Sequence, residues 1–157
     1  MDIRWRWGKV RGKTRIFALP LAALLLTLSG LDLRASHPPL ITPETIAGST
    51  VINAEQLIEF ANQTPGLIII DSRIPGDRKQ GYIETSISLP DIDTHCDRLA
   101  RIIPDKAAPV LFYCNGIKCG RSGKAVKIAV NCGYSNIYWF RGGFQEWLAK
   151  GYPYLQE

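Results

Sequence analysis

The stretch from Val110 to Val126, which reads VLFYCNGIKCGRSGKAV, is the feature that most constrains the fold of this chain. A short apolar run ends at Cys114, a loop with glycines and a second cysteine follows, and Arg121 opens an amphipathic pattern of helical spacing. We interpret this stretch as a strand, a loop and a helix. A loop that leads into a helix N-terminus gathers backbone N–H groups and the positive end of the helix dipole, which favour an anion. A cysteine at the mouth of such a loop is biased toward thiolate, so Cys114 is a candidate nucleophile.

Short apolar runs and helical patterns alternate along the rest of the chain. The runs predict strands at 67–70, 87–89, 110–113 and 137–140, and helical patterns follow Asn53, Thr94, Gly120 and Gly143. Asn53 is expected to cap the first helix in a capping box with Gln56, and Thr94 is expected to cap the second. The polar segment 72–82 is expected to be a loop. Strands and helices that alternate over short connections predict an α/β fold, in three layers α/β/α around a mainly parallel central sheet. Ligands bind such sheets at the carboxyl ends of the strands, which is where Asp71 and Cys114 fall.

The first 35 residues differ in composition from the remainder. Six basic residues within the first fifteen precede an apolar run from Ile16 to Leu28, as in a secretory signal. We expect residues 1–35 to be a signal peptide or signal anchor, 36–48 a linker rich in Pro, Ser and Thr, and 49–157 a single domain. The protein is therefore expected to be exported to the periplasm, and to be held at the inner membrane only if the leader is retained.

The positive charge of the chain belongs to this leader. The net charge is +5, and residues 1–35 carry seven Lys and Arg against two Asp. The remaining residues carry equal numbers of both signs, so they offer no phosphate-tracking surface and predict no nucleic-acid partner.

Five segments together resemble single-domain rhodaneses, which are sulfurtransferases. They are the strand into Asp71-Ser72-Arg73, GYIETSISLP at 81–90, the strand into Cys114, the loop into Arg121-Ser122, and YWFRGGFQEWLAKGYP at 138–153. The resemblance implies a rhodanese-like fold and transfer of sulfur through a cysteine persulfide on Cys114. The implied partners are a small anionic donor such as thiosulfate and an acceptor such as cyanide, a thiol or a protein, with no cofactor and no metal.

The candidate site residues follow from this resemblance and from the charge of the substrate. Cys114 is the expected nucleophile, and Arg121 is expected to stabilise negative charge because donor and persulfide are both anionic. Asp71 is expected to brace the site rather than react, since buried charges are normally paired. The expected substrate-binding residues are Arg73, Asn115, Gly116, Ile117, Lys118, Gly120 and Ser122.

The loop departs from the family in length, and this leaves the role of Cys119 open. Six residues separate Cys114 from Arg121, where rhodanese loops commonly have four before the helix mouth. The strand end favours Cys114 as the nucleophile, whereas the helix and Arg121 allow Cys119. Cys119 is expected to be a resolving thiol, an alternative nucleophile or an ordinary loop residue. A dithiol oxidoreductase that uses both cysteines and a non-catalytic sulfur carrier therefore remain alternatives.

The other two cysteines and the two histidines carry no predicted chemistry. Cys96 and Cys132 fall at core positions of predicted helices. The cysteine spacings contain no paired C-x-x-C motif, and His37 and His95 lack companions, so no metal site is expected.

Overall fold

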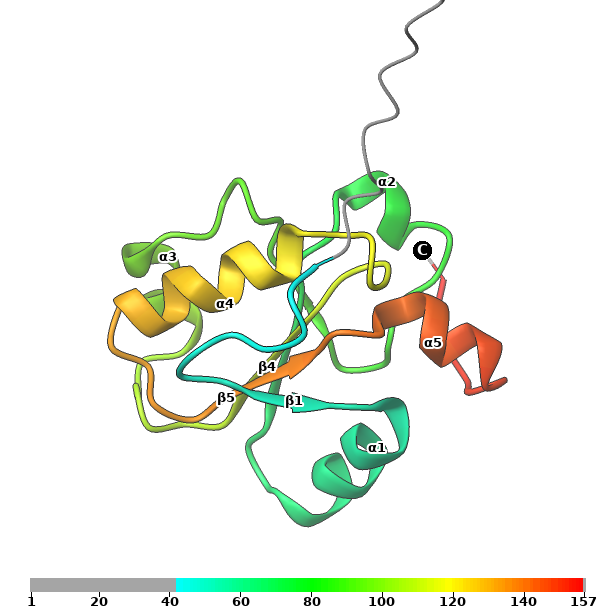
Figure 1. Ribbon diagram of the computed structural model, residues 1–157, viewed down its shortest axis with the longest axis horizontal. Helices are drawn as coiled ribbons and strands as arrows, with labels where there is room; N and C mark the ends of the chain where they lie inside the picture. The colour runs from blue at the N-terminus through cyan, green and yellow to red at the C-terminus, as the bar shows by residue number, and fades with distance from the viewer. Residues whose placement is uncertain (1–41, 157) are drawn as a thin grey trace, which may run out of the picture. The chain divides into compact units, whose positions relative to one another are not determined.

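A parallel sheet of five strands lies between two layers of helices in the computed structural model, which describes residues 42–156 (Figure 1). The strands follow the order β1-β5-β4-β2-β3 across the sheet, and every pair is parallel. This arrangement confirms the predicted α/β fold. The strands are β1 (Thr50–Ile52), β2 (Ile68–Asp71), β3 (Ile87–Ser88), β4 (Val110–Tyr113) and β5 (Ile137–Phe140). The helices are α1 (Ala54–Gln63), α2 (Pro75–Arg78), α3 (Cys96–Ile102), α4 (Arg121–Asn131) and α5 (Gly143–Ala149).

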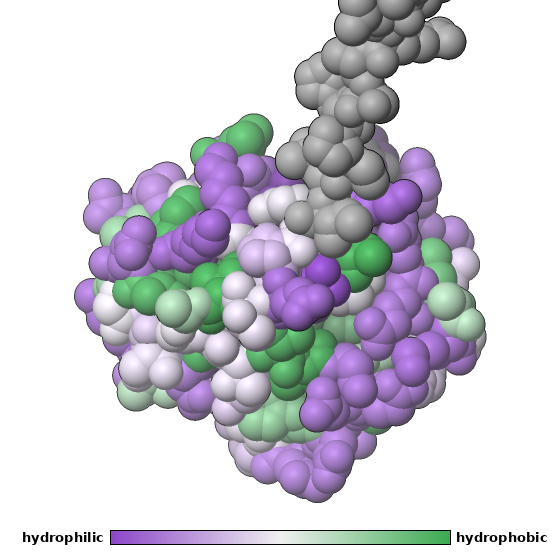
Figure 2. All heavy atoms as spheres, in the orientation of Figure 1, coloured by the Kyte–Doolittle hydropathy of each residue, from purple (hydrophilic) through white to green (hydrophobic). Residues whose placement is uncertain are grey.

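The central strands bury both of their faces, because alternate side chains point to opposite sides of a strand. In β4, Phe112 packs into a core with α3 and α4, while Leu111 and Tyr113 pack into a second core with α1 and α5. Figure 1 shows the same division, with α3 and α4 on one side of the sheet and α1 and α5 on the other. The two cores hold β4 rigidly at the centre of the fold. The face in Figure 2 is largely polar, and its apolar residues form small separate patches.

Two elements differ from the expectations from sequence. Strand β1 was not predicted, because three residues at the edge of a sheet are too few to show a periodicity. Helix α2 lies within the segment 72–82, which was expected to be a loop, and it begins at Pro75, a residue that suits the first turn of a helix.

The helix caps were predicted with mixed success. The capping box of α1 is present: Asn53 Oδ1 accepts from the Gln56 amide (2.8 Å), and Gln56 Oε1 accepts from the Asn53 amide (2.9 Å). The predicted cap of α3 is wrong by one residue, because His95 and not Thr94 is the N-cap. The Thr94 hydroxyl instead donates to the Pro90 carbonyl (3.0 Å), so it stabilises the preceding turn.

A disulfide between Cys96 and Cys132 joins α3 to α4, with 5.4 Å between their Cα atoms. Cys132 is buried at the C-terminal end of α4, as predicted, but Cys96 is exposed at the first position of α3. The prediction of a core position for Cys96 is therefore wrong, because the helix begins at this residue and its first turn lies at the end of α4.

The described part of the predicted linker, residues 42–48, packs against the domain. Ile46 is 7% exposed and belongs to the core on the α4 side of the sheet. The predicted leader, residues 1–35, and residues 36–41 lie outside the described residues. Within residues 42–156, no helix combines the length and the apolar character needed to cross a membrane.

Candidate active site

Cys114 follows directly after β4, at the carboxyl edge of the sheet. Strand β4 lies between β5 and β2, and the register pairs Tyr113 at its end with Asp71 at the end of β2. Cys114 is 1% exposed, so its side chain is buried at this edge of the sheet. The topology therefore brings Asp71 and Cys114, which are 43 positions apart in the sequence numbering, to one edge.

The first turn of α5 fixes the backbone at Cys114. The amide of Phe144 donates to the Cys114 carbonyl (2.8 Å), and the amide of Gln145 donates to the Asn115 carbonyl (2.7 Å). Gly143 precedes them with φ +58°, and a Cβ there would collide with the Cys114 carbonyl oxygen. A glycine is needed at this position both for the left-handed backbone and for the close approach.

The far side of the loop is held by the segment before β1. The Thr42 amide and hydroxyl both donate to the Ile117 carbonyl, each at 2.9 Å. Arg141 in turn donates to the carbonyls of Pro43 (2.8 Å) and Thr42 (2.9 Å). Arg141 thus braces the loop indirectly, through residues that the sequence did not connect with it.

Cys114 and Cys119 are joined by a disulfide, with 6.2 Å between their Cα atoms. The Cys119 amide donates to the Gly116 carbonyl (2.8 Å), which closes a turn inside the loop. Cys119 is half-buried, in contrast to Cys114. The expected nucleophile, Cys114, and the alternative, Cys119, are therefore bonded to each other.

A pocket of about 420 Å³ opens beside this loop. Its lining includes Cys119 but not Cys114, and it contains two cationic side chains and no carboxylate. The lining residues are Asn115, Gly116, Lys118, Cys119, Gly120, Arg121 and Gln145. Gln145, which comes from α5, was not predicted, although it lies within the segment 138–153 that carries the resemblance. The pocket suits a small anion.

Arg121 is paired with two carboxylates that the sequence did not connect with the site. Its Nη1 atom lies 3.4 Å from Asp77 Oδ2, and its Nε atom lies 3.8 Å from Asp91 Oδ1. Asp77 also accepts a hydrogen bond from Asn115 Nδ2 (2.8 Å). Nη1 of Arg121 lies 3.9 Å from the Cys119 sulfur as well. The guanidinium is thus oriented toward the loop while its charge is partly offset.

Arg73 lies in a buried network around Asp71 and is not among the residues of the pocket. Its Nε and Nη2 atoms donate to the two Asp71 oxygens (2.9 and 2.7 Å), and Nη2 also donates to the Gly81 carbonyl (2.8 Å). Arg78 Nη1 and the Tyr113 hydroxyl donate to Asp71 Oδ2 at 3.3 and 2.8 Å. Arg73 was expected to bind substrate. In the structure its bidentate pair with Asp71 keeps the side chain buried, at 2% exposure, and it does not reach the pocket.

Burial and the Asp71 charge shift the pKa values in this network. Burial lowers the pKa of Arg73, but the hydrogen bond with Asp71 and its negative charge outweigh burial, so the pKa is raised. Burial, followed by the charge of Asp71, raises the pKa of Tyr113 far above its usual value. The raised pKa values keep Arg73 charged and the Tyr113 hydroxyl protonated near neutral pH.

Two more of the expected substrate-binding residues lie away from the pocket. Ser122 is 2% exposed, and its hydroxyl accepts a hydrogen bond from Trp139 Nε1 (3.0 Å), so it faces the sheet. The side chain of Ile117 is 41% exposed and does not line the pocket, whereas its carbonyl holds Thr42. The structure does bring together Asn115, Gly116, Lys118, Gly120, Arg121 and Cys119.

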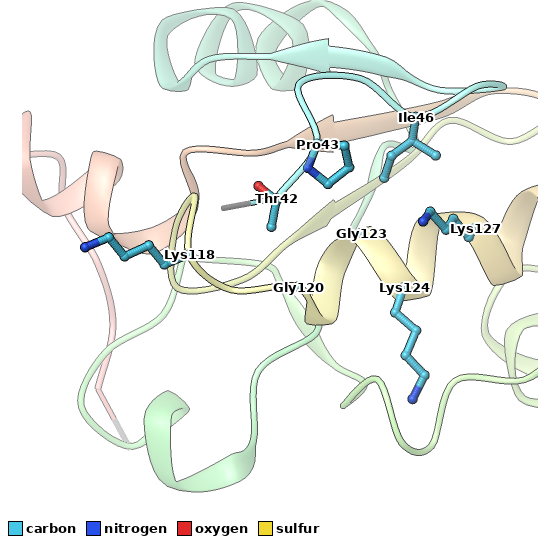
Figure 3. Close-up of a pocket in the computed structure, with 8 residues that line it drawn as sticks. All are labelled: Thr42, Pro43, Ile46, Lys118, Gly120, Gly123, Lys124 and Lys127. Atoms are coloured by element: carbon cyan, nitrogen blue, oxygen red, sulfur yellow. The ribbon is translucent and has the colours of Figure 1, made fainter. Parts of the chain in front are cut away.

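A second pocket of about 360 Å³ lies on the other side of the loop, against the start of α4 (Figure 3). Three lysines lie on its rim: Lys118, Lys124 and Lys127. Figure 3 shows that their side chains point in different directions, and Lys124 is paired with Asp91 (3.1 Å). These lysines do not converge on one anion, so the pocket beside Cys119 is the stronger candidate.

The described residues contain no cluster of three or more His, Cys, Asp or Glu side chains that could hold a metal ion. His95 caps α3 and lies outside the pocket. His37 lies outside the described residues.

Comparison with known proteins gives consistent matches over the domain. Residues 53–150 match the family described as "Rhodanese-like domain". A rhodanese domain-containing protein of Drosophila melanogaster is 32% identical over 111 residues, which cover 61% of this chain and 94% of the relative. The thiosulfate:glutathione sulfurtransferase of Saccharomyces cerevisiae is 32% identical over 98 residues, which cover 55% of this chain and 68% of the relative. The crystal structure of a rhodanese-related protein from Thermoplasma volcanium is 29% identical, with a TM-score of 0.57, and the match covers 69% of this chain and 99% of that one.

Proposed function

Because this chain belongs to the family of rhodanese-like domains, we propose that it is a sulfurtransferase that carries sulfur as a persulfide on Cys114. The observation that carries the proposal is the place of Cys114: it follows directly after the central strand β4, and the first turn of α5 fixes its carbonyl. The related yeast protein is named for thiosulfate and glutathione, which supports thiosulfate as a donor and a thiol as an acceptor.

The proposed reaction begins with the reduced form, because a disulfide contains no thiolate. The Cys114 thiolate attacks the outer sulfur of thiosulfate, the sulfur–sulfur bond of the donor breaks, and sulfite leaves. A thiolate or cyanide then attacks the outer sulfur of the persulfide and restores Cys114. Lys118, Arg121 and the loop amides stabilise the negative charge that both steps bring to the loop.

The proposal includes export to an oxidising compartment, in which residues 1–35 act as the leader. The two disulfides support it, because they join all four cysteines of the chain, and disulfides persist mainly in oxidising compartments. N-terminal sequencing of the protein recovered from a periplasmic extract tests this part. A protein found in the cytosolic fraction with its leader intact contradicts it.

The disulfide between Cys114 and Cys119 favours a second candidate, a dithiol oxidoreductase. In that function the pair exchanges electrons with an external dithiol and never carries sulfur. A non-catalytic sulfur carrier would form the persulfide and hold it without turnover.

One experiment separates the three functions. The reduced full chain is incubated with thiosulfate, sulfite is measured, and the cysteines are mapped by mass spectrometry. We expect one added sulfur atom on Cys114 and none in Cys114→Ser. The absence of both sulfite and persulfide, with rapid disulfide exchange against a dithiol, overturns the proposal in favour of the oxidoreductase. A persulfide that neither cyanide nor a thiol removes shows a carrier.

A further inference from the structure

We propose that Cys119 is a second catalytic residue, which cleaves the Cys114 persulfide and releases its sulfur as hydrosulfide. The second substrate of the reaction is then an external dithiol, which acts as the reductant of the disulfide that remains. This inference rests on the proposed sulfurtransferase function and names the chemical class of its second substrate, a dithiol reductant.

The backbone holds Cys119 within bonding reach of Cys114. The two Cα atoms are 6.2 Å apart, a separation typical of bonded cysteines. The contacts that keep them there do not depend on the sulfur–sulfur bond: α5 anchors Cys114, Thr42 anchors the middle of the loop at Ile117, and Cys119 donates to Gly116. A nucleophile held in this way reacts with an effective concentration far above that of a free thiol.

The surroundings of Cys119 favour its thiolate. Nη1 of Arg121 lies 3.9 Å from the Cys119 sulfur. Asp77 and Asp91 hold that guanidinium on the loop side of α4. A cation beside a cysteine stabilises the thiolate, which is the form that attacks a persulfide.

The proposed step balances without a further reactant. The Cys119 thiolate attacks the Cys114 sulfur, a bond forms between these two atoms, and the bond from the Cys114 sulfur to the outer sulfur breaks. The outer sulfur leaves with the electron pair and the persulfide proton as hydrosulfide. An external dithiol then reduces the disulfide and becomes a disulfide itself. In sum, thiosulfate and a dithiol give sulfite, hydrogen sulfide and an oxidised dithiol.

The exposure of the two sulfurs determines where the reductant attacks. In the disulfide-bonded form, Cys114 is 1% exposed, whereas Cys119 lines the pocket of about 420 Å³. An external thiolate therefore meets Cys119 first, forms a mixed disulfide with it and releases Cys114 as a thiolate. That product is the form that takes the next sulfur from the donor, so each reduction prepares the next cycle.

A single-turnover experiment tests the inference. The full chain is reduced, freed of reductant and mixed with thiosulfate, after which sulfite and hydrosulfide are measured and the cysteines are mapped. We expect the wild type to release one hydrosulfide for each sulfite and to end with Cys114 bonded to Cys119. In Cys119→Ser we expect the ratio of hydrosulfide to sulfite to fall by about tenfold or more, with a persulfide left on Cys114.

The matched control is the double variant Cys96→Ser/Cys132→Ser, which also removes one disulfide and should keep the ratio at one. A wild type that ends with a stable persulfide and a free Cys119 overturns the inference, and so does equal hydrosulfide release from Cys119→Ser. The mapping of the wild type decides even if a variant does not fold. If no sulfite appears from the wild type, the sulfurtransferase function itself fails, which is a different result.

Discussion

Removal of the Cys96–Cys132 disulfide should destabilise the domain more than removal of the Cys114–Cys119 disulfide. The first bridge spans 36 residues and the second spans 5. A disulfide stabilises a fold mainly because it restricts the unfolded chain, and this effect grows with the length of the closed loop. The loop-entropy relation gives about 4 kcal/mol for the longer loop and about 2 kcal/mol for the shorter one at 25 °C.

The assay is urea unfolding of the double alanine variants Cys96→Ala/Cys132→Ala and Cys114→Ala/Cys119→Ala beside the oxidised wild type. We expect free energies of unfolding lower by about 4 and about 2 kcal/mol, with steeper denaturant dependence in both because the unfolded chains expand. Equal losses in the two variants would refute the argument from loop length. A loss below about 1 kcal/mol for the α3–α4 bridge would refute it as well.

Three further predictions follow from the buried network and from α5. Asp71→Asn should lower the free energy of unfolding by about 3 kcal/mol, because it leaves the Arg73 charge buried without its partner; a urea titration that shows no change contradicts this. Gly143→Ala should lower the free energy of unfolding by about 1–2 kcal/mol for the left-handed backbone alone. It should also slow sulfite release from thiosulfate, because the new Cβ displaces the Cys114 carbonyl. Unchanged release would show that α5 does not position the cysteine. Burial raises the pKa of Tyr113, so its stabilising contribution is full below the unfolded value of 10.0 and is lost as the pH rises above it. Above about pH 10, the free energy of unfolding of the wild type should therefore fall by about 1.4 kcal/mol per pH unit more steeply than that of Tyr113→Phe. Parallel stability curves would contradict this.

The sequence was sufficient to predict four of the five strands because the central strands are continuous apolar runs. The run before Cys114 and the run before Asp71 are each buried on both faces, so their composition is unambiguous. Strand β1 and helix α2 escaped prediction because three or four residues carry too little pattern. The position of Cys96 was misjudged because helical periodicity does not tell where the first turn begins.

The candidate site was harder to predict because its walls come from distant segments. The loop itself supplies most of the pocket and was identified from its own residues. Gln145 enters it from α5, and Asp77 reaches Arg121 from α2, 44 positions away. Thr42 holds the loop from 75 positions away. These contacts depend on the packing of the elements, for which local sequence patterns give no signal.

The two arginines expected at the site show how packing decides between a structural and an anion-binding role. Arg73 makes bidentate contacts with Asp71 at 2% exposure, and breaking such a buried pair costs about 3–5 kcal/mol. A bound anion could not recover that loss. The Arg121 side chain is 35% exposed and lies 3.4 and 3.8 Å from its two carboxylates, contacts of the kind that contribute about 0–1 kcal/mol. Of these two arginines, only Arg121 can therefore exchange a protein carboxylate for a substrate anion at small cost, and it is the one that lies beside the cysteine loop.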